Sequence, residues 1–172
     1  MGTYKRFRPA YGLIILAAIV LAFLLLYDRP VVPVLRPAGD GPEAVTIFFP
    51  DGRGKLGKKM VEVQKNMSNK ARADIIFREL KGARSIPDRL RLYDMAVGQD
   101  GVLYLNLSKE FMDPGSPGRE VTMVYSLVDS FLASFPNTKS VQLLVEGKAV
   151  YTRSGLLYIL EPLQFNKELL ED

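Results

Sequence analysis

The chain has 172 residues, with 23 lysines and arginines against 19 aspartates and glutamates, and it contains no cysteine, histidine or tryptophan. Without cysteine no disulfide can form, and without cysteine or histidine the usual ligands of zinc, iron and copper are missing. A Ser-His-Asp or Cys-His nucleophilic centre is excluded for the same reason, and no glycine-rich phosphate-binding motif occurs. We therefore predict a non-enzymatic protein with no catalytic residue, no metal site and no cofactor.

The N-terminal part of the sequence predicts a membrane anchor. Residues 10–27 read AYGLIILAAIVLAFLLLY and carry no charge. A helix of this length spans roughly 27 Å, close to the apolar thickness of a bilayer. The preceding segment, 1–9, holds three basic residues, which favour the cytoplasmic side of a membrane: Lys5, Arg6 and Arg8. We expect a single-pass protein whose C-terminal part is extracytoplasmic, so nucleic acid is not an expected partner.

A cleaved signal peptide is the alternative interpretation of this segment. Its apolar core would be about 7–15 residues, shorter than the run observed, and the small residues that signal peptidase requires are absent just after Tyr27. Residues 28–44 are rich in proline and predict an extended linker. We place one domain at 45–166, followed by a tail at 167–172.

The first half of the domain predicts two strands and a helix. Residues 45–49 are β-branched or aromatic and precede a Pro-Asp-Gly turn, and 59–64 alternate like a strand returning beside them. A helix is expected over 69–81, capped by Ser68 or Asn69 and ended by Gly82. Its apolar stripe comprises Ala73, Ile76, Phe77 and Leu80.

The second half repeats the pattern. Strands are expected at 91–97 and 102–107, joined by an Asp-Gly turn, which is a strong hairpin signal. A loop at 112–118 precedes a helix at 119–134, whose apolar face includes Val124 and Phe131. A strand at 141–145 follows, with 149–152 pairing back onto it. Two amphipathic helices need one apolar surface to cover, so we predict an α+β fold: a single small domain with a mixed sheet and both helices on one face.

Charge is distributed unevenly along the domain. Residues 45–91 hold twelve Lys and Arg against five Asp and Glu, a net charge of +7, whereas 92–172 hold six against eleven, a net charge of −5. Such a chain could associate head to tail with copies of itself or bind an anionic surface. The interpretation we favour is that the two halves interleave in the fold and their charges mix.

Three sets of side chains are candidates for a site. The first is a basic loop, a contact for an anionic polymer or a partner: Arg53, Lys55, Lys58 and Lys59. The second is a carboxylate pair for sugar hydrolysis, Glu110 and Asp113, although both lie in a polar, turn-rich stretch where solvated acids are usual. The third, Ser126 with a lysine, lacks the S-x-x-K motif. The apolar helix residues belong to the core and not to a ligand site.

Five segments together resemble the sporulation and spore germination domain called GerMN. They are VTIFFPDGRGKL, ARADIIFRELKG, DGVLYLNLSKEF, VYSLVDSFLASFPNTKSVQLLVEGK and EPLQFN, and they run across residues 45–166. The resemblance implies a small α/β domain similar to the ring-building motif of secretion and sporulation assemblies. It also implies an extracytoplasmic, membrane-tethered protein of the bacterial envelope without an established activity or cofactor.

One position separates catalytic from structural interpretations of the resemblance. Asn106 stands where the family usually has aspartate. Because asparagine cannot ionise, acid-base chemistry there would fail. We expect its side chain to cap the turn at 108–110 instead.

Two functions remain for the chain as a single-pass protein of the bacterial cytoplasmic membrane. In the first, the domain binds envelope proteins or itself, through sheet edges or helix faces. In the second, it binds cell-wall glycan or, less in keeping with the composition, cleaves it. The missing histidine and cysteine favour the first.

Overall fold

The computed structural model describes residues 43–113, 117–151 and 155–171. The expected membrane span at 10–27 and all but the last two residues of the expected linker lie outside this range. No helix within the described residues is long and apolar enough to cross a bilayer. All described residues belong to one structural unit, Pro42–Asp172.

The elements follow the expected order, with shifted boundaries. Their bounds are β1 Glu43–Pro50, β2 Leu56–Val63, α2 Asn69–Gly82, β3 Leu92–Val97, β4 Val102–Leu107, a 3-10 turn Lys109–Met112, α3 Pro117–Ser134, β5 Ser140–Val145, β6 Lys148–Ala149 and a second 3-10 turn Lys167–Leu169. The first strand thus begins within the expected linker. Ser68 caps α2, because its Oγ accepts a hydrogen bond from the N–H of Ala71 at 3.2 Å.

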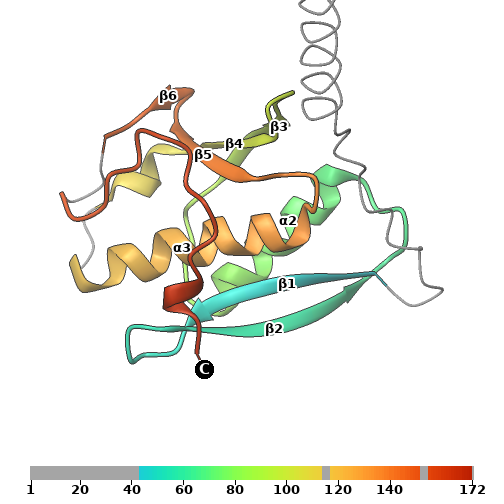
Figure 1. Ribbon diagram of the computed structural model, residues 1–172, viewed down its shortest axis with the longest axis horizontal. Helices are drawn as coiled ribbons and strands as arrows, with labels where there is room; N and C mark the ends of the chain where they lie inside the picture. The colour runs from blue at the N-terminus through green and yellow to red at the C-terminus, as the bar shows by residue number, and fades with distance from the viewer. Residues whose placement is uncertain (1–42, 114–116, 152–154, 172) are drawn as a thin grey trace, which may run out of the picture. The chain divides into compact units, whose positions relative to one another are not determined.

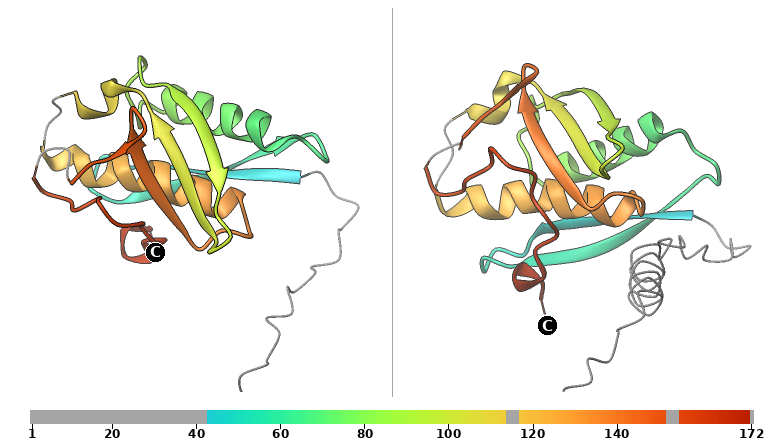
Figure 2. Two further views of the ribbon diagram at one scale, coloured as in Figure 1. Left: turned by 90° about the horizontal axis from the view of Figure 1, so that it is seen from above. Right: turned by 45° about the horizontal axis from the view of Figure 1, so that its top comes forward.

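The main sheet has four strands in the order β3-β4-β5-β6. Strands β4 and β5 run parallel, while the outer pairs are antiparallel, so the predicted mixed sheet is confirmed. Both helices lie on one face of this sheet (Figure 1 and Figure 2). The connection from β4 to β5 contains α3, as a crossover between parallel strands requires.

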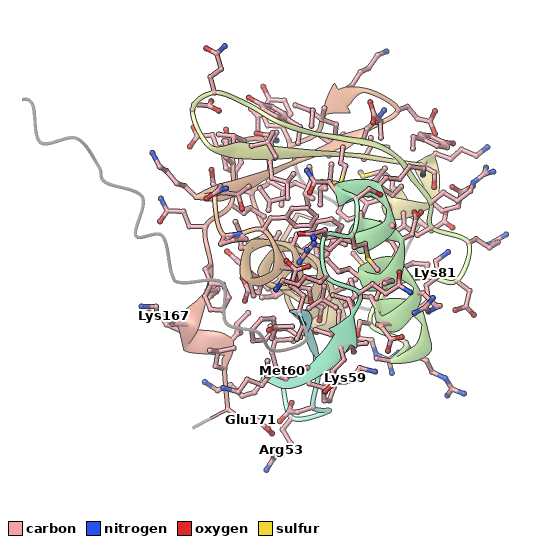
Figure 3. All side chains as sticks on the ribbon, turned by 90° about the vertical axis from the view of Figure 1, so that its right-hand side faces the viewer. Arg53, Lys59, Met60, Lys81, Lys167 and Glu171 are labelled. Carbon is pink, nitrogen blue, oxygen red and sulfur yellow. The ribbon has the colours of Figure 1, made fainter. Side chains whose placement is uncertain are left out.

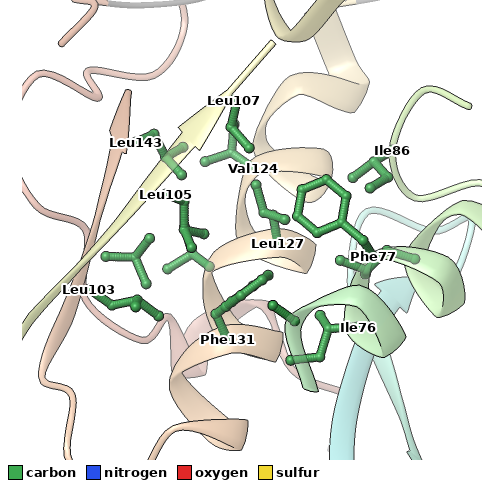
Figure 4. Close-up of a cluster of buried hydrophobic side chains, with 14 of the residues drawn as sticks. Ile76, Phe77, Ile86, Leu103, Leu105, Leu107, Val124, Leu127, Phe131 and Leu143 are labelled. Atoms are coloured by element: carbon green, nitrogen blue, oxygen red, sulfur yellow. The ribbon is translucent and has the colours of Figure 1, made fainter. Parts of the chain in front are cut away.

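The core fills the space between the main sheet and the helices. Leu103, Leu105 and Leu107 alternate along β4 and are fully buried. Phe77 of α2 meets Phe131 of α3 edge to face, with ring centroids 6.1 Å apart. Figure 4 shows these side chains converging from β4, α2 and α3. The helical stripes expected from the sequence therefore do form the core.

The first hairpin is a correction to the predicted single sheet. Strands β1 and β2 pair antiparallel and form a separate two-stranded sheet. Helix α3 lies between this hairpin and the main sheet (Figure 1). The hairpin does not join the main sheet, because α3 lies between them and the edge of β1 that faces away from β2 lies against this helix.

A row of serines on α3 makes this contact. Ser126, Ser130 and Ser134 are four residues apart, so they lie on one face of the helix, and all three are buried. The N–H of Phe48 donates to Ser130 Oγ at 2.8 Å, and the N–H of Thr46 donates to Ser134 Oγ at 3.3 Å. Small side chains let the strand approach the helix, and the hydroxyls of Ser130 and Ser134 replace the missing neighbouring strand.

We predict that Ser130→Ala destabilises the domain by about 1–3 kcal/mol, because it leaves the buried N–H of Phe48 without an acceptor. The matched control is Ser85→Ala. Ser85 is also buried, but its Oγ has no hydrogen-bond partner among the described residues, so its loss is expected to change stability by less than about 0.5 kcal/mol. Urea denaturation measures both. Equal effects would show that the Ser130 bond contributes nothing.

Candidate functional site

The basic loop is held by acidic groups of the domain itself. Asp51 Oδ1 accepts hydrogen bonds from the N–H groups of Arg53 and Lys55, at 2.8 and 2.9 Å. The guanidinium of Arg53 lies 3.0 Å from Asp51 and 2.6 Å from Glu171, and the Lys55 ammonium donates to the carbonyl of Glu168. Hydrogen bonds from Arg53 to Asp51 and then to Glu171 raise the pKa of the guanidinium. Both cations are therefore already engaged at the hairpin tip, where Figure 3 shows Arg53 beside Glu171.

The other two cations of the predicted loop belong to β2 and point to opposite faces of the hairpin. Lys59 lies on the α2 side, where its ammonium is 2.8 Å from Glu79. Its hydrogen bond is the main cause of the lowered pKa of Glu79. Lys58 is exposed on the other face. The structure therefore does not gather the four predicted residues into one free basic cluster.

The two halves of the sequence also exchange ion pairs. Arg53 and Arg89 of the basic half lie 2.6 and 3.7 Å from Glu171 and Asp113 of the acidic half. These pairs mix charge across the halves at two places. They also place Asp113 beside a cation, whereas a hydrogen bond from Ser108 lowers the pKa of Glu110. A general acid for sugar hydrolysis needs a raised pKa, so this pair is poorly suited to that chemistry.

Asn106 has a structural contact other than the expected one. Its Oδ1 accepts a hydrogen bond from the N–H of Gly147 at 2.7 Å, so it holds the turn between β5 and β6 and not the turn at 108–110. Glu146, in the same turn, accepts the N–H of Lys109 at 2.9 Å. The neutral amide suffices for this bond, because only an acceptor is needed.

The C-terminal segment ties the two sheets together. Leu163 exchanges backbone hydrogen bonds with Val141 of β5, each 2.8 Å long. Phe165 then packs edge to face on Phe48 of β1, with ring centroids 5.4 Å apart. Further on, the N–H of Glu171 donates to the carbonyl of Leu56 at 3.3 Å, which places the segment at one end of β2.

A buried carboxyl group on α3 helps to hold this segment. Asp129 is fully buried, and its Oδ1 accepts the N–H of Asn166 at 3.1 Å. Burial raises its pKa to about 7, an effect that the single backbone hydrogen bond only partly offsets. Its Oδ2 has no partner among the described residues, so no second hydrogen bond stabilises the charged form there.

The β3 edge of the main sheet is protected. The N–H of Gly98 donates a hydrogen bond to the carbonyl of Val102 at 2.8 Å. In an antiparallel pair, residues whose backbone groups point toward the neighbouring strand alternate with residues whose groups point away from it, so the backbone groups of Met95 and Val97 point away from β4. The N–H of Met95 already donates a hydrogen bond to Asp94 Oδ1, at 2.8 Å. A bulge between Leu92 and Asp94 also distorts the strand. Such features discourage strand addition.

The outer edge of β2 is regular, and beyond Leu56 no described residue pairs with its backbone. The carbonyl of Leu56 points outward to Glu171, and in an antiparallel strand every second residue points the same way. Lys58, Met60 and Glu62 therefore present their backbone groups outward. All three side chains are exposed, and Met60 is 74% exposed (Figure 3).

We call Lys58, Met60 and Glu62 the open edge. The sequence signal for it is the alternation of 59–64, which indicated a strand but gave no sign of which edge stays free. The predicted basic loop overlaps the open edge only at Lys58.

A pH prediction follows from Asp129. Between about pH 4 and 7 the folded domain keeps a proton that the unfolded chain releases, so stability falls as the pH rises through this window. Asp129→Asn keeps the acceptor for Asn166 but cannot ionise. It should match the parent near pH 4 and exceed it by about 1–3 kcal/mol at pH 8, measured by urea denaturation. Asp88→Asn, at an exposed position, is the control. An Asp129→Asn curve parallel to that of the parent would contradict the expectation.

Comparisons with known proteins support the fold. The first GerMN domain of the sporulation protein GerM from Bacillus subtilis matches with a TM-score of 0.54 and 14% identity, covering 73% of this chain and 98% of that one. A putative lipoprotein from Clostridium perfringens matches with a TM-score of 0.50 and 19% identity, covering 74% and 89%. The tandem GerMN domains of GerM match with a TM-score of 0.54 and 14% identity. This match covers 73% of this chain and 45% of the tandem-domain chain.

Among curated proteins no match was found. A family model does match, over residues 46–151, and its description is Germane, sporulation and spore germination. That range contains both helices, the whole four-stranded sheet and all of the hairpin except the first three residues of β1. The resemblance seen in the sequence is thereby confirmed: the chain belongs to the Germane family of sporulation and spore germination domains.

Proposed function

We propose that this chain is a non-enzymatic interaction module of the bacterial cell envelope, anchored by residues 10–27 and exposed outside the cytoplasmic membrane. Its partners are envelope proteins, which it binds through the backbone of a strand edge. The open edge of β2 carries the proposal. It offers a row of unpaired backbone groups on an otherwise paired hairpin, the arrangement that β-strand addition uses.

The chemistry of the open edge suits a protein ligand. Backbone hydrogen bonds would supply affinity, and the side chains beside them would supply selectivity. Met60 is a flexible apolar contact of the kind used at adaptable binding surfaces. Lys58 and Glu62 flank it with opposite charges, so a matching strand needs an acid and a base at corresponding positions.

Cell-wall polymer is the second candidate ligand, and the predicted basic residues would bind it. Arg53, Lys55 and Lys59 already contact Glu171, Glu168 and Glu79. An anionic polymer would have to displace these contacts, which lowers its net gain. Protein binding is therefore the function we favour.

The protein-binding proposal is tested with the full-length chain in membranes of the source bacterium. A photo-crosslinking residue placed at Lys58 should form adducts with neighbouring envelope proteins. Adding Met60→Pro removes an outward N–H without breaking a bond to β1, and we expect at least a tenfold loss of these adducts, because strand addition needs that N–H.

The matched control is Val97→Pro, which removes an outward N–H from β3, the protected edge. Adduct yield should be unchanged in this variant. If both proline variants lose adducts equally, or neither does, the open edge is not the binding site.

The polymer alternative makes a different prediction. Lys58→Glu reverses the charge of the exposed cation that is shared by the basic loop and the open edge. We expect it to leave co-sedimentation of the full-length chain with purified cell-wall sacculi within about twofold of the parent. A loss of more than about tenfold would instead support wall binding through this loop.

A further inference from the structure

We propose that the ligand of the open edge is the open edge of a second copy, paired antiparallel about a two-fold axis through Met60. This inference rests on the proposed function and names its partner. The pairing would join the two hairpins into one four-stranded sheet, β1-β2 continued by β2-β1 of the partner. The interface is self-complementary, as a two-fold axis demands.

The register follows from which residues point outward. Two outward residues that face each other exchange both backbone hydrogen bonds. With the axis at Met60, this residue faces the partner's Met60, and Lys58 faces the partner's Glu62. By symmetry Glu62 faces Lys58 of the partner subunit. Three such pairs form, each with two hydrogen bonds.

The side chains favour this register over those with the axis at Lys58 or Glu62. The three outward residues also share one face of the hairpin, so directly opposed side chains are in contact. The axis at Met60 places two Lys–Glu pairs around a Met–Met contact and covers a side chain that is 74% exposed. An axis at Lys58 would oppose two lysines, and an axis at Glu62 would oppose two glutamates. Both arrangements are repulsive.

The ends of β2 are compatible with such a pair. At one end Leu56 is already occupied by the C-terminal segment, through Leu170 and Glu171. The partner strand would reach that point only at Gln64. However, β2 ends at Val63, and the chain then turns, with Asn66 at a φ of 61°. The partner strand therefore leaves the edge before it meets the segment.

The surface involved is small, which sets the expected strength. A stable interface buries about 800 Å² on each partner, more than one short strand edge provides. We expect weak pairing that depends on a high local concentration. A shared membrane would supply that concentration if both copies are anchored.

The absence of cysteine allows a position-specific test. Met60→Cys, in the full-length chain in its membrane, introduces a single thiol on the proposed axis. Facing residues of such a pair have Cα atoms about 5.5 Å apart, within the range of a disulfide. Mild oxidation should give a disulfide-linked dimer on a non-reducing gel. Glu62→Cys alone should give at least tenfold less, whereas Glu62→Cys mixed with Lys58→Cys should link. Lys148→Cys, exposed on β6, is the control for random collision.

A charge exchange provides the second measurement, made in the Met60→Cys background. Lys58→Glu should lower the dimer yield by about tenfold, because it opposes two glutamates on each side of the axis. Adding Glu62→Lys restores opposite charges in the same register and should restore the yield.

Several outcomes would overturn the pairing. Equal linking at all four positions would indicate random collision, and no linking at Met60, or no rescue by the charge exchange, would contradict the register. If Met60→Cys forms no dimer while adducts at Lys58 still depend on Met60, the partner is a different envelope protein and the proposed function stands. If those adducts are also insensitive to Met60→Pro, both proposals fail.

Discussion

The contact between β1 and α3 determines the arrangement of the rest of the molecule. A strand edge normally needs another strand, but here Ser130 and Ser134 accept the N–H groups of Phe48 and Thr46. The helix thereby closes one edge of the hairpin and separates it from the main sheet. Because a two-stranded sheet has two edges, this contact leaves the outer edge of β2 as the hairpin edge that, beyond Leu56, no described residue pairs with.

The C-terminal segment restricts that edge from the other side. It leaves the main sheet at Leu163, covers Phe48 with Phe165 and reaches β2 only at Leu56. The middle of β2 remains uncovered among the described residues. Asp129 couples the segment to α3, because its Oδ1 accepts a hydrogen bond from the N–H of Asn166. The open edge therefore depends on α3 twice, through its serines and through its carboxyl group.

The sequence predicts the elements better than their contacts. Apolar spacing at Ile76 and Phe77, and the Asp-Gly turn before β4, are local signals, so the helices and the main sheet were predictable. The serines of α3 look like ordinary polar positions, since only their distance from β1 in the fold gives them a role. Asn106 meets Gly147 across 41 residues of chain, and the C-terminal segment has no periodicity. The open edge was unpredictable for the same reason. Whether a strand edge is covered depends on the position of segments that are distant in the sequence.

The edges at β2 and β3 differ in a way that argues for function at β2. Natural sheets usually protect edges with bulges and charges, because a bare edge pairs without selectivity. Strand β3 has both a bulge and a charged residue at its edge, and Asp94 Oδ1 accepts a hydrogen bond from the N–H of Met95. At β2 the strand is regular, and its charges sit beside open backbone groups without blocking them. In the pairing we propose, Lys58 and Glu62 would penalise mismatched strands and accept a complementary one, so the edge would be selective.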